Sequence, residues 1–567
     1  MDLSLANKLE DSDERISISN HFKIVAGPGA GKTRFLINHI QHIIEKSDKI
    51  SDIRKVACIT YTNVGVETIV HRLGNYTDYV DVSTIHSFLY LNVVKPYLWV
   101  LIGDYQFDFS KIDGHDEIIP TYSIMTEWKK RTNQYALNDN KKLAKELSKL
   151  SWSLDGEEII LGFRNNWEGK VGNYSIKKDS YLEYKKICWE TGLLSHDDIL
   201  FLSVKIIEKA TRVLEIIRAK FPYILVDEFQ DTNPIQTKIL KLIGDKETVI
   251  GVIGDECQSI YGFQGADVTQ FKNFHLLGIK TYYIEDNRRS TQEIISVLNN
   301  IRNDTFFYQK SPKNVRGDKP VILVGGFFDS YNEVIKLCDK DELYTLSFKN
   351  ELCNRVEYGV DDYFSDDVSD EFIFSDGDRG KMIFYIIHSL EYCKQHKFKD
   401  AIKFMRKAYR KVDGFGDKEA LENLKRLYDM YSIIKCKNIK KFYNKYIYDY
   451  YGVKAKVTRG NAHNYYSNLT YSNVACALSL SDDAGKFRTI HKSKGDEFES
   501  VLLLIEPKEN FNEDTELAFL LNPDMNNESQ RVYYVALSRA RQNLYICVPQ
   551  LSDKNRRKLS NFNIINI

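Results

Sequence analysis

The chain has 567 residues, 43% of them hydrophobic and 28% charged, and its 79 lysines and arginines balance its 79 aspartates and glutamates. This composition predicts a globular protein of three or four domains and excludes a global basic field for nucleic acid, so any DNA-binding surface has to be local. The nine cysteines are dispersed without a Cys-x-x-Cys pair, which argues against a zinc or iron–sulfur site and is typical of a reducing compartment.

The N-terminal region and the most apolar stretch bear on location. Residues 1–15 are acidic and lack the apolar core of a secretory signal. Residues 88–103 are the most apolar stretch, but Asn92, Lys95 and Pro96 interrupt it and it is shorter than a membrane span. We therefore expect a cytoplasmic protein with no membrane partner, and we expect residues 88–103 to lie in the core.

Residues 22–44 have the order strand, glycine-rich loop, helix. FKIVA (22–26) is a β-branched run typical of a buried strand, and TRFLINHIQHII (33–44) carries an apolar stripe at helical spacing. The glycines let backbone N–H groups point at an anion in front of the helix, Lys32 would reach the β- and γ-phosphates, and Thr33 would ligate Mg²⁺. A glycine-rich turn without a ligand is the alternative, and the flanking strand and helix argue against it. The predicted nucleotide-binding residues are Ala26, Gly27, Pro28, Gly29, Ala30, Gly31, Lys32, Thr33 and Arg34.

FPYILVDEFQDTNPIQ (221–236) supplies the carboxylates that such a loop needs. YILV is a predicted strand that runs into Asp227 and Glu228. Carboxylates at the carboxyl end of a strand lie where α/β sheets bind ligands. We predict that Asp227 holds Mg²⁺ together with Thr33, and that Glu228 polarises the attacking water. An acidic turn is the alternative, and hydrolase and transferase chemistry both remain open here.

VIGVIGDECQSIYGFQGA (249–266) combines a predicted strand, Gly254-Asp255, Gln258 and an aromatic-rich turn. Together with DEFQDTNPIQ it resembles superfamily 1 helicases of the UvrD/Rep/PcrA type. Five further segments resemble motifs of that family in the same order along the chain, at 59–73, 83–88, 284–290, 489–504 and 528–546.

The resemblance implies an ATP-dependent DNA helicase that moves 3′ to 5′ on single-stranded DNA, with ATP and Mg²⁺ as cofactors. It implies that Gln258, Arg289 and Arg539 contact the γ-phosphate, and that Glu497 binds the ribose. For either arginine a surface salt bridge is the alternative. The catalytic set is then Lys32, Asp227, Glu228, Gln258, Arg289 and Arg539.

Single-stranded DNA and a duplex with a 3′ tail are the implied nucleic-acid partners. Stacking on aromatic side chains suits a motor because every base has a π-face, so the grip tolerates any sequence. The chain has 36 tyrosines and 30 phenylalanines, so the alternative is that the aromatic candidates are core residues. The implied DNA-binding residues are Tyr61, Thr62, Asn63, Thr84, His86, Phe263 and His491.

Four positions depart from the family pattern. No glutamine precedes Gln41, although the family has an adenine-contacting glutamine upstream of the phosphate loop. Gln264 replaces an arginine that helps to couple nucleotide to DNA, and glutamine carries no charge. Arg288 replaces an adenine-stacking tyrosine, although guanidinium also stacks, and Asp496 replaces an apolar residue. These departures predict altered nucleotide selectivity and looser coupling.

The fold class predicted is α/β, with two RecA-like parallel-sheet motor domains of the P-loop NTPase type, each carrying a mostly helical insertion. The predicted boundaries are domain 1A at 1–90 and 195–285, insertion 1B at 91–194, domain 2A at 286–360 and 480–567, and insertion 2B at 361–479.

Insertion 2B is shorter than is usual in the family. It begins with an acidic run at 361–378, and basic helices with interleaved aromatics follow at 394–411 and 435–446. A solvated face and a DNA contact are both open for these helices. The short form is similar to the helicase subunit of Gabija-type antiviral systems, which accompanies a nuclease. The alternative function is therefore a DNA- or nucleotide-sensing ATPase with weak unwinding and a nuclease partner. The pathway, whether DNA repair, replication or phage defence, stays open.

Overall fold

The computed structural model describes residues 5–164, 168–361, 368–451, 455–478 and 485–567. The chain forms two compact units. The first unit comprises Met1–Arg289, Asn303–Asn314 and Met525–Arg531, and the second comprises Ser290–Arg302, Val315–Asp524 and Val532–Ile567.

The first unit is built on a seven-stranded sheet whose neighbouring strands pair in parallel. At Gly251, paired with Phe22, an added Cβ would lie 2.2 Å from the Phe22 ring, so the glycine leaves room for that ring to cross the neighbouring strand. The spatial order is β1 (Asn7–Lys8), β11 (Lys280–Ile284), β2 (Phe22–Ala26), β10 (Val249–Gly254), β9 (Tyr223–Val226), β3 (Val56–Thr60) and β4 (Val80–Thr84).

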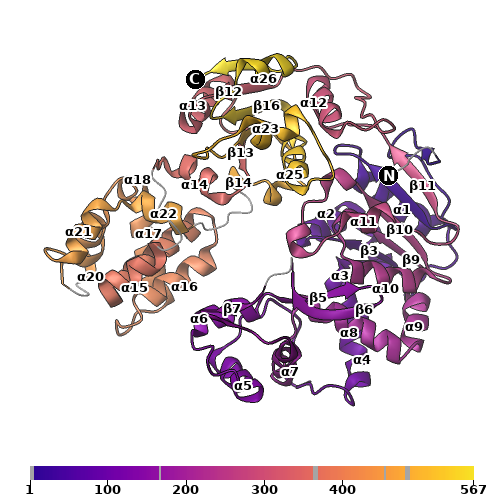
Figure 1. The fold of residues 1–567 in the computed structure, drawn as a ribbon, viewed down its shortest axis with the longest axis horizontal. Coiled ribbons are helices and arrows are strands. Elements are labelled where there is room, and N and C mark those ends of the chain that lie inside the picture. Colours follow the sequence, from indigo (N-terminus) through magenta and orange to yellow (C-terminus); the bar gives the residue numbers. More distant parts are fainter. Residues whose placement is uncertain (1–4, 165–167, 362–367, 452–454, 479–484) are drawn as a thin grey trace. The chain divides into compact units, whose positions relative to one another are not determined.

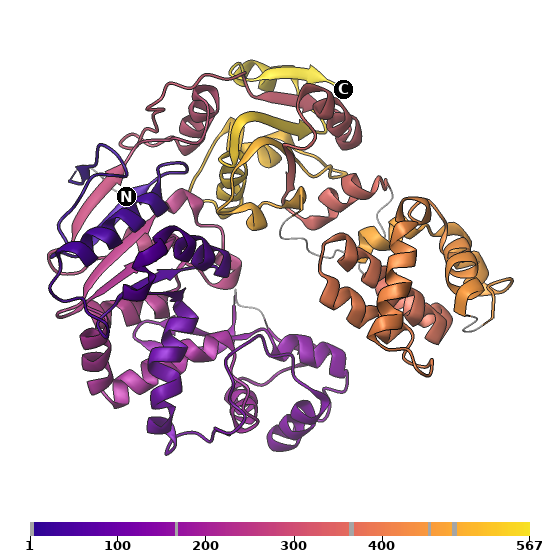
Figure 2. The same ribbon diagram turned by 180° about the vertical axis from the view of Figure 1, so that it is seen from behind.

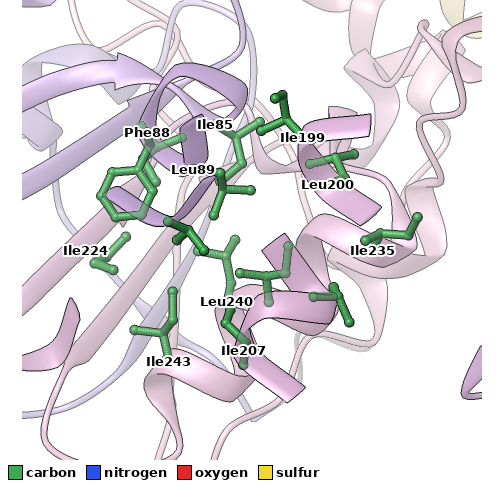
Figure 3. Packing of buried hydrophobic residues seen from close by; sticks show 14 of the residues in the cluster. Ile85, Phe88, Leu89, Ile199, Leu200, Ile207, Ile224, Ile235, Leu240 and Ile243 are labelled. Atoms are coloured by element: carbon green, nitrogen blue, oxygen red, sulfur yellow. The ribbon is translucent and has the colours of Figure 1, made fainter. Parts of the chain in front are cut away.

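Helices cover both faces of this sheet, and the strands run between α1 and α10 in Figure 1. Successive side chains of a strand point to opposite faces, so Ile224 and Val226 join one core cluster while Tyr223 and Leu225 join the other. One face packs against α1 (Lys32–Lys46) and α2 (Asn63–Leu73). The other packs against α3 (Ile85–Leu89), α8 (His196–Lys209) and α10 (Pro234–Gly244), as Figure 3 shows at close range.

The apolar stretch at 88–103, predicted to lie in the core, does so only in part, because Leu91, Trp99 and Ile102 are more than half exposed. Phe88, Leu89, Val93 and Val94 are completely buried in the cluster behind the sheet. Within the described ranges, no helix is both long enough and apolar enough to cross a membrane.

The segment between α3 and α8 is mixed rather than purely helical. It contains α5 (Tyr122–Thr132), α6 (Asn140–Leu147) and α7 (Tyr181–Glu190). The stretch that looked turn-rich in the sequence forms two antiparallel hairpins, β5 (Leu150–Asp155) with β6 (Glu158–Phe163) and β7 (Lys170–Val171) with β8 (Tyr174–Ser175). We call residues 102–195 the first insertion.

A buried carboxylate fastens the first insertion to α8. Asp198 is fully buried and accepts hydrogen bonds from the indole N–H groups of Trp152 (2.8 Å) and Trp189 (3.1 Å) and from the backbone N–H of Ser195 (2.9 Å). The Nζ of Lys185, itself buried, lies 2.9 Å from Asp198 Oδ1. These contacts lower the pKa of Asp198 against the opposing effect of burial.

The second unit contains a six-stranded sheet whose neighbouring strands again pair in parallel. Its order is β14 (Phe487–Thr489), β13 (Leu343–Ser347), β15 (Phe498–Leu504), β16 (Ala540–Val548), β12 (Val321–Val324) and β17 (Asn563–Asn566). Two parallel sheets covered by helices confirm the predicted fold class.

A bundle of helices is inserted between β13 and β14. Figure 2 shows these helices in orange, and they include α15 (Val368–Lys394), α16 (Phe398–Ala408), α17 (Asp417–Asp429) and α22 (Tyr471–Leu478). On α16 the lysine and arginine side chains are mostly exposed while Ala401 and Met405 are buried. Residues 362–367 of the acidic run lie outside the described residues. DNA contact by the basic helices stays a prediction.

Candidate functional site

The glycine-rich loop joins β2 to α1, and its backbone conformation requires glycine at two positions. Gly29 has φ 73° and Gly31 has φ 83°, in the left-handed region that other residues rarely adopt. A Cβ on Gly29 would lie 2.4 Å from Asn287 Oδ1, and one on Gly31 would lie 2.8 Å from Ser12 Oγ. The loop therefore presents bare backbone at the N-terminus of α1, where N–H groups and the helix dipole favour an anion.

The two predicted phosphate-handling segments meet in the first unit. Lys32 begins α1, and its Nζ lies 3.5 Å from Glu228 Oε2, with both side chains largely shielded from solvent. Asp227 follows the end of β9 and is buried, and its Oδ1 accepts a hydrogen bond from the Glu228 N–H at 2.9 Å. Glu228 itself has φ 52°, an uncommon value for a residue with a side chain and one that recurs at functional sites.

A hydrogen-bonded relay leads from Glu228 to Gln258. Gln230 Nε2 donates to Glu228 Oε2, and Gln230 Oε1 accepts from the backbone N–H of Asp255 at 3.0 Å. Gln258 Nε2 in turn donates to Asp255 Oδ2 at 2.8 Å. Gln258 was predicted, whereas Gln230 and Asp255 were missed as site residues although both lie inside the motifs that carried the prediction.

The other predicted loop residues lie around this centre. Ala26 ends β2, and the Ala30 N–H donates to Gly27 O at 3.3 Å. The Arg34 guanidinium makes a bidentate contact with Asp13, at 2.6 Å to each carboxylate oxygen. Arg289 lies beside the loop, because a Cβ on Gly29 would come within 2.9 Å of Arg289 Cβ.

Three predicted residues belong to the second unit. Arg539 is 2% exposed, and its guanidinium donates to the carbonyls of Val535 (3.1 Å) and Asp496 (3.2 Å). The bond to Asp496 places Arg539 beside the segment that carries Glu497, whose side chain is exposed. The His491 ring packs edge-on against Phe348 with centroids 5.7 Å apart.

The three residues that replace family residues, Gln264, Arg288 and Asp496, each contact a neighbouring side chain in the structure. Arg288 is held by Asp286 (3.0 Å) and Asp11 (3.3 Å). Asp496 pairs at 2.7 Å with the buried Arg488, so its charge compensates a guanidinium that packs against the stacked rings of Tyr344 and Phe498. Gln264 Oε1 accepts a hydrogen bond of 2.6 Å from the Tyr61 hydroxyl.

An aromatic row lies on the predicted DNA side of the first unit. Tyr61 stacks on Tyr261 with centroids 4.8 Å apart, and Tyr261 lies 6.1 Å from Phe263. Phe263 is 57% exposed, so it is not a core residue. Tyr261 was missed, although it precedes Phe263 by two positions in the aromatic-rich turn. We call Tyr61, Tyr261 and Phe263 the aromatic row.

Two of the polar residues predicted to contact phosphates also cap helices. The Thr62 hydroxyl accepts from the Gly65 N–H at the start of α2, and the Thr84 hydroxyl accepts from the Ser87 N–H at the start of α3. Asn63 is exposed as the first residue of α2.

His86 lies in a group of three histidines. Its ring centroid is 5.7 Å from that of His196 and 6.3 Å from that of His115, and the two Nδ1 atoms of His115 and His196 are 2.7 Å apart. Burial, together with these neighbours, lowers the pKa of His86 to about 3. His86 is therefore neutral near pH 7, so the predicted DNA contact would involve an uncharged ring rather than a cation.

This pKa predicts an acid-sensitive contribution to stability. The unfolded-state pKa of histidine is near 6.5, so the unfolded chain binds more protons and stability falls as the pH drops from about 7 toward 3. Relative to His86→Gln, the wild type should lose about 1–2 kcal/mol between pH 7.5 and pH 5. Urea unfolding at both pH values measures the difference. If the difference in unfolding free energy between the wild type and His86→Gln did not change with pH, the prediction would be contradicted.

The side chains of the first unit fit a nucleoside triphosphate with Mg²⁺. The loop contributes glycine backbone without side chains, and the side chains contribute the Lys32 ammonium group, the Thr33 hydroxyl and the carboxylates of Asp227 and Glu228. Across the described ranges, no cluster of three or more His, Cys, Asp or Glu side chains is arranged to hold a metal by itself. Mg²⁺ suits such a site because it binds through one or two carboxylates, substrate phosphates and water.

Comparisons with known protein families match most of the chain. The profile of the UvrD/REP helicase N-terminal domain matches residues 10–276, and that of the UvrD-like helicase C-terminal domain matches residues 327–550.

Individual relatives match about half of the chain. Gabija protein GajB of Bacillus cereus (strain HuB5-5) is 30% identical over 330 residues, which cover 50% of this chain and 47% of the relative. The ATP-dependent DNA helicases Rep of Buchnera aphidicola and PcrA of Bacillus subtilis are 29% and 28% identical over 52% of this chain and over 42% and 38% of their own lengths. The alignments thus span less than half of the curated relatives. With both domain profiles matched in order, the chain belongs to the UvrD/Rep family of helicases.

Proposed function

We propose that this chain hydrolyses ATP and uses the energy to move 3′ to 5′ along single-stranded DNA and to separate duplex. The observation that carries the proposal is the distance of 3.5 Å between Lys32 Nζ and Glu228 Oε2, beside a loop in which Gly29 and Gly31 leave no room for a Cβ atom. The family membership supports the activity, and the direction comes from the family resemblance alone.

Different residues of the first unit carry different steps of the proposed hydrolysis. Lys32 balances the charge of the terminal phosphates, and Glu228 orients the attacking water and accepts its proton. Asp227 and Thr33 are the side chains that would hold Mg²⁺. A Mg²⁺ ion held there would neutralise charge that develops on the phosphate oxygens. Arg289 and, from the second unit, Arg539 are proposed to stabilise the transition state as arginine fingers do.

The relay beyond Glu228 supports coupling between hydrolysis and DNA. Gln230 and Asp255 connect Glu228 to Gln258, and the Ser259 hydroxyl donates to the Gln230 carbonyl at 3.0 Å. The turn that follows Ser259 carries Tyr261 and Phe263. A change in the hydrogen bonds of Glu228 during hydrolysis therefore has a continuous path to the aromatic row.

Strand displacement on tailed duplexes tests the proposal. We expect ATP-dependent separation of a duplex with a 3′ single-stranded tail and none with a 5′ tail. Lys32→Ala, which removes the phosphate-binding ammonium, is the matched control and should separate neither. Preference for the 5′ tail would overturn the direction, and DNA-stimulated hydrolysis without separation of either substrate would overturn the helicase assignment.

A second candidate is a sensing ATPase that acts with a nuclease partner. The match to a protein named for the Gabija system favours it, as does the short insertion 2B, the bundle of helices between β13 and β14. The same assay discriminates, because this candidate predicts DNA-dependent hydrolysis with weak or absent strand separation until the partner is added.

A further inference from the structure

Arg164 links the first insertion to the turn that carries Phe263. It follows directly after β6, and three of its nitrogens donate hydrogen bonds: Nε to Ser151 Oγ (3.1 Å), Nη1 to the Phe263 carbonyl (3.4 Å) and Nη2 to Asp197 Oδ2 (3.2 Å). Ser151 lies on β5 and Asp197 in the first turn of α8. One guanidinium therefore joins three elements around the aromatic row.

The turn is shaped to receive this cation. Gly265 has φ 94°, and a Cβ added there would lie 3.1 Å from Arg164 Cζ, so the glycine lets the guanidinium pack against bare backbone. The turn supplies no cation of its own, because residues 259–267 contain neither lysine nor arginine. At the position where the family has an arginine, Gln264 accepts a hydrogen bond from Tyr61 instead.

A DNA strand bound to the aromatic row brings its phosphates close to the Arg164 guanidinium. Bases that stack on Tyr61 and Phe263 carry backbone charge past the turn, and charge neutralisation supplies much of the affinity of proteins for nucleic acid. The Arg164 side chain is 32% exposed, so it reaches solvent beside the exposed Phe263. Its three hydrogen bonds within the described part of the chain use three of the five guanidinium N–H groups, which leaves donors for a phosphate.

We propose that Arg164, which belongs to the first insertion, supplies the positive charge that the uncharged Gln264 lacks. The Arg164 guanidinium binds a phosphate of the DNA strand next to the base that stacks on Phe263. This inference rests on the proposed function, since it needs a strand on the aromatic row. Asp197 orients the guanidinium and is not itself a DNA contact.

The salt dependence of single-strand binding measures such a contact. Each phosphate contact on single-stranded DNA contributes about 0.7 to the slope of log Kobs against log salt concentration. Arg164→Ala should therefore lower the slope by about 0.7 and weaken binding about five-fold at 0.1 M monovalent salt. Lys170→Ala, which removes one exposed positive charge from the same insertion, should leave the slope unchanged. Adding Gln264→Arg to Arg164→Ala should restore it.

Asp197→Asn separates this role from a purely structural one. If the Arg164–Asp197 pair only fastens the insertion, losing either partner weakens DNA binding alike. If Arg164 binds phosphate, Asp197→Asn removes a competing anion, so affinity and slope stay equal to the wild type or rise. Weaker binding by Asp197→Asn, or an unchanged slope in Arg164→Ala, overturns the inference.

Two further readouts keep the test decisive. Should Arg164→Ala not fold, Arg164→Gln removes the charge while retaining an amide donor, and the same loss of slope is expected. Wild-type protein that fails to bind single-stranded DNA would refute the proposed function itself. Wild-type binding with no change on removing the Arg164 charge would refute this inference alone.

Discussion

Glu228→Gln is expected to lower the steady-state rate of ATP hydrolysis about a thousandfold, within the range of about 10²–10⁴ that a positioned general base contributes. The amide keeps the shape of the side chain and can still accept the hydrogen bond from Gln230, but it cannot take a proton from water. Lys32 and the glycine loop are untouched, so ATP should still bind. Phosphate release measures the first effect, and equilibrium binding of a fluorescent ATP analogue measures the second.

The same chemical change at an exposed position is the control. Glu215 lies on α9 (Arg212–Lys220), is exposed and takes no part in the site, so Glu215→Gln should hydrolyse ATP at the wild-type rate. Normal turnover in Glu228→Gln would remove Glu228 as the base. Loss of ATP binding along with turnover would instead assign Glu228 to holding the loop through Lys32.

The local parts of the site could be predicted because short sequence patterns determine them. The strand at Phe22–Ala26 has the predicted bounds, and Lys32 begins a helix after two glycines with positive φ. A β-branched run, a glycine loop and an amphipathic stripe each act within a few residues, where backbone sterics and periodicity decide the structure. The position of the carboxylates at the end of β9 follows from the same kind of pattern.

Contacts between distant segments could not be predicted in this way. Gln230 joins Glu228 to Asp255 only because β9 and β10 are neighbours in the sheet. The order of strands in a sheet depends on which strands pair, and the periodicity of the sequence does not determine it. Arg164 lies 99 positions from Phe263, and nothing in its own surroundings in the sequence points to that turn. The hairpin of β5 and β6 did leave a signal in the sequence, because the two-residue turn between the paired Asp155 and Glu158 begins with a glycine, Gly156, at φ 58°.

Asp198→Asn is expected to lower the free energy of unfolding of the first unit by about 3–5 kcal/mol, the usual effect of breaking a buried ion pair from one side. The Lys185 ammonium, 3% exposed, would be left without its counter-charge, and the new amide nitrogen would face N–H donors. Trp152 and Trp189 both donate to this carboxylate, so tryptophan fluorescence during urea unfolding reports on the site directly. The first unfolding transition should move to lower urea concentration.

Two controls show whether the buried charge is the cause. Lys185→Met removes the cation instead and leaves the carboxylate with two indole donors and a backbone donor, so it should cost clearly less than Asp198→Asn. Lys209→Met breaks an exposed pair with Asp104 and should cost less than about 1 kcal/mol. Equal losses in Asp198→Asn and Lys185→Met would mean that packing, not the unpaired charge, holds the insertion to α8. Because Arg164 belongs to the first insertion and donates to the Phe263 carbonyl, loosening the insertion should weaken single-strand binding before it affects ATP binding at Lys32.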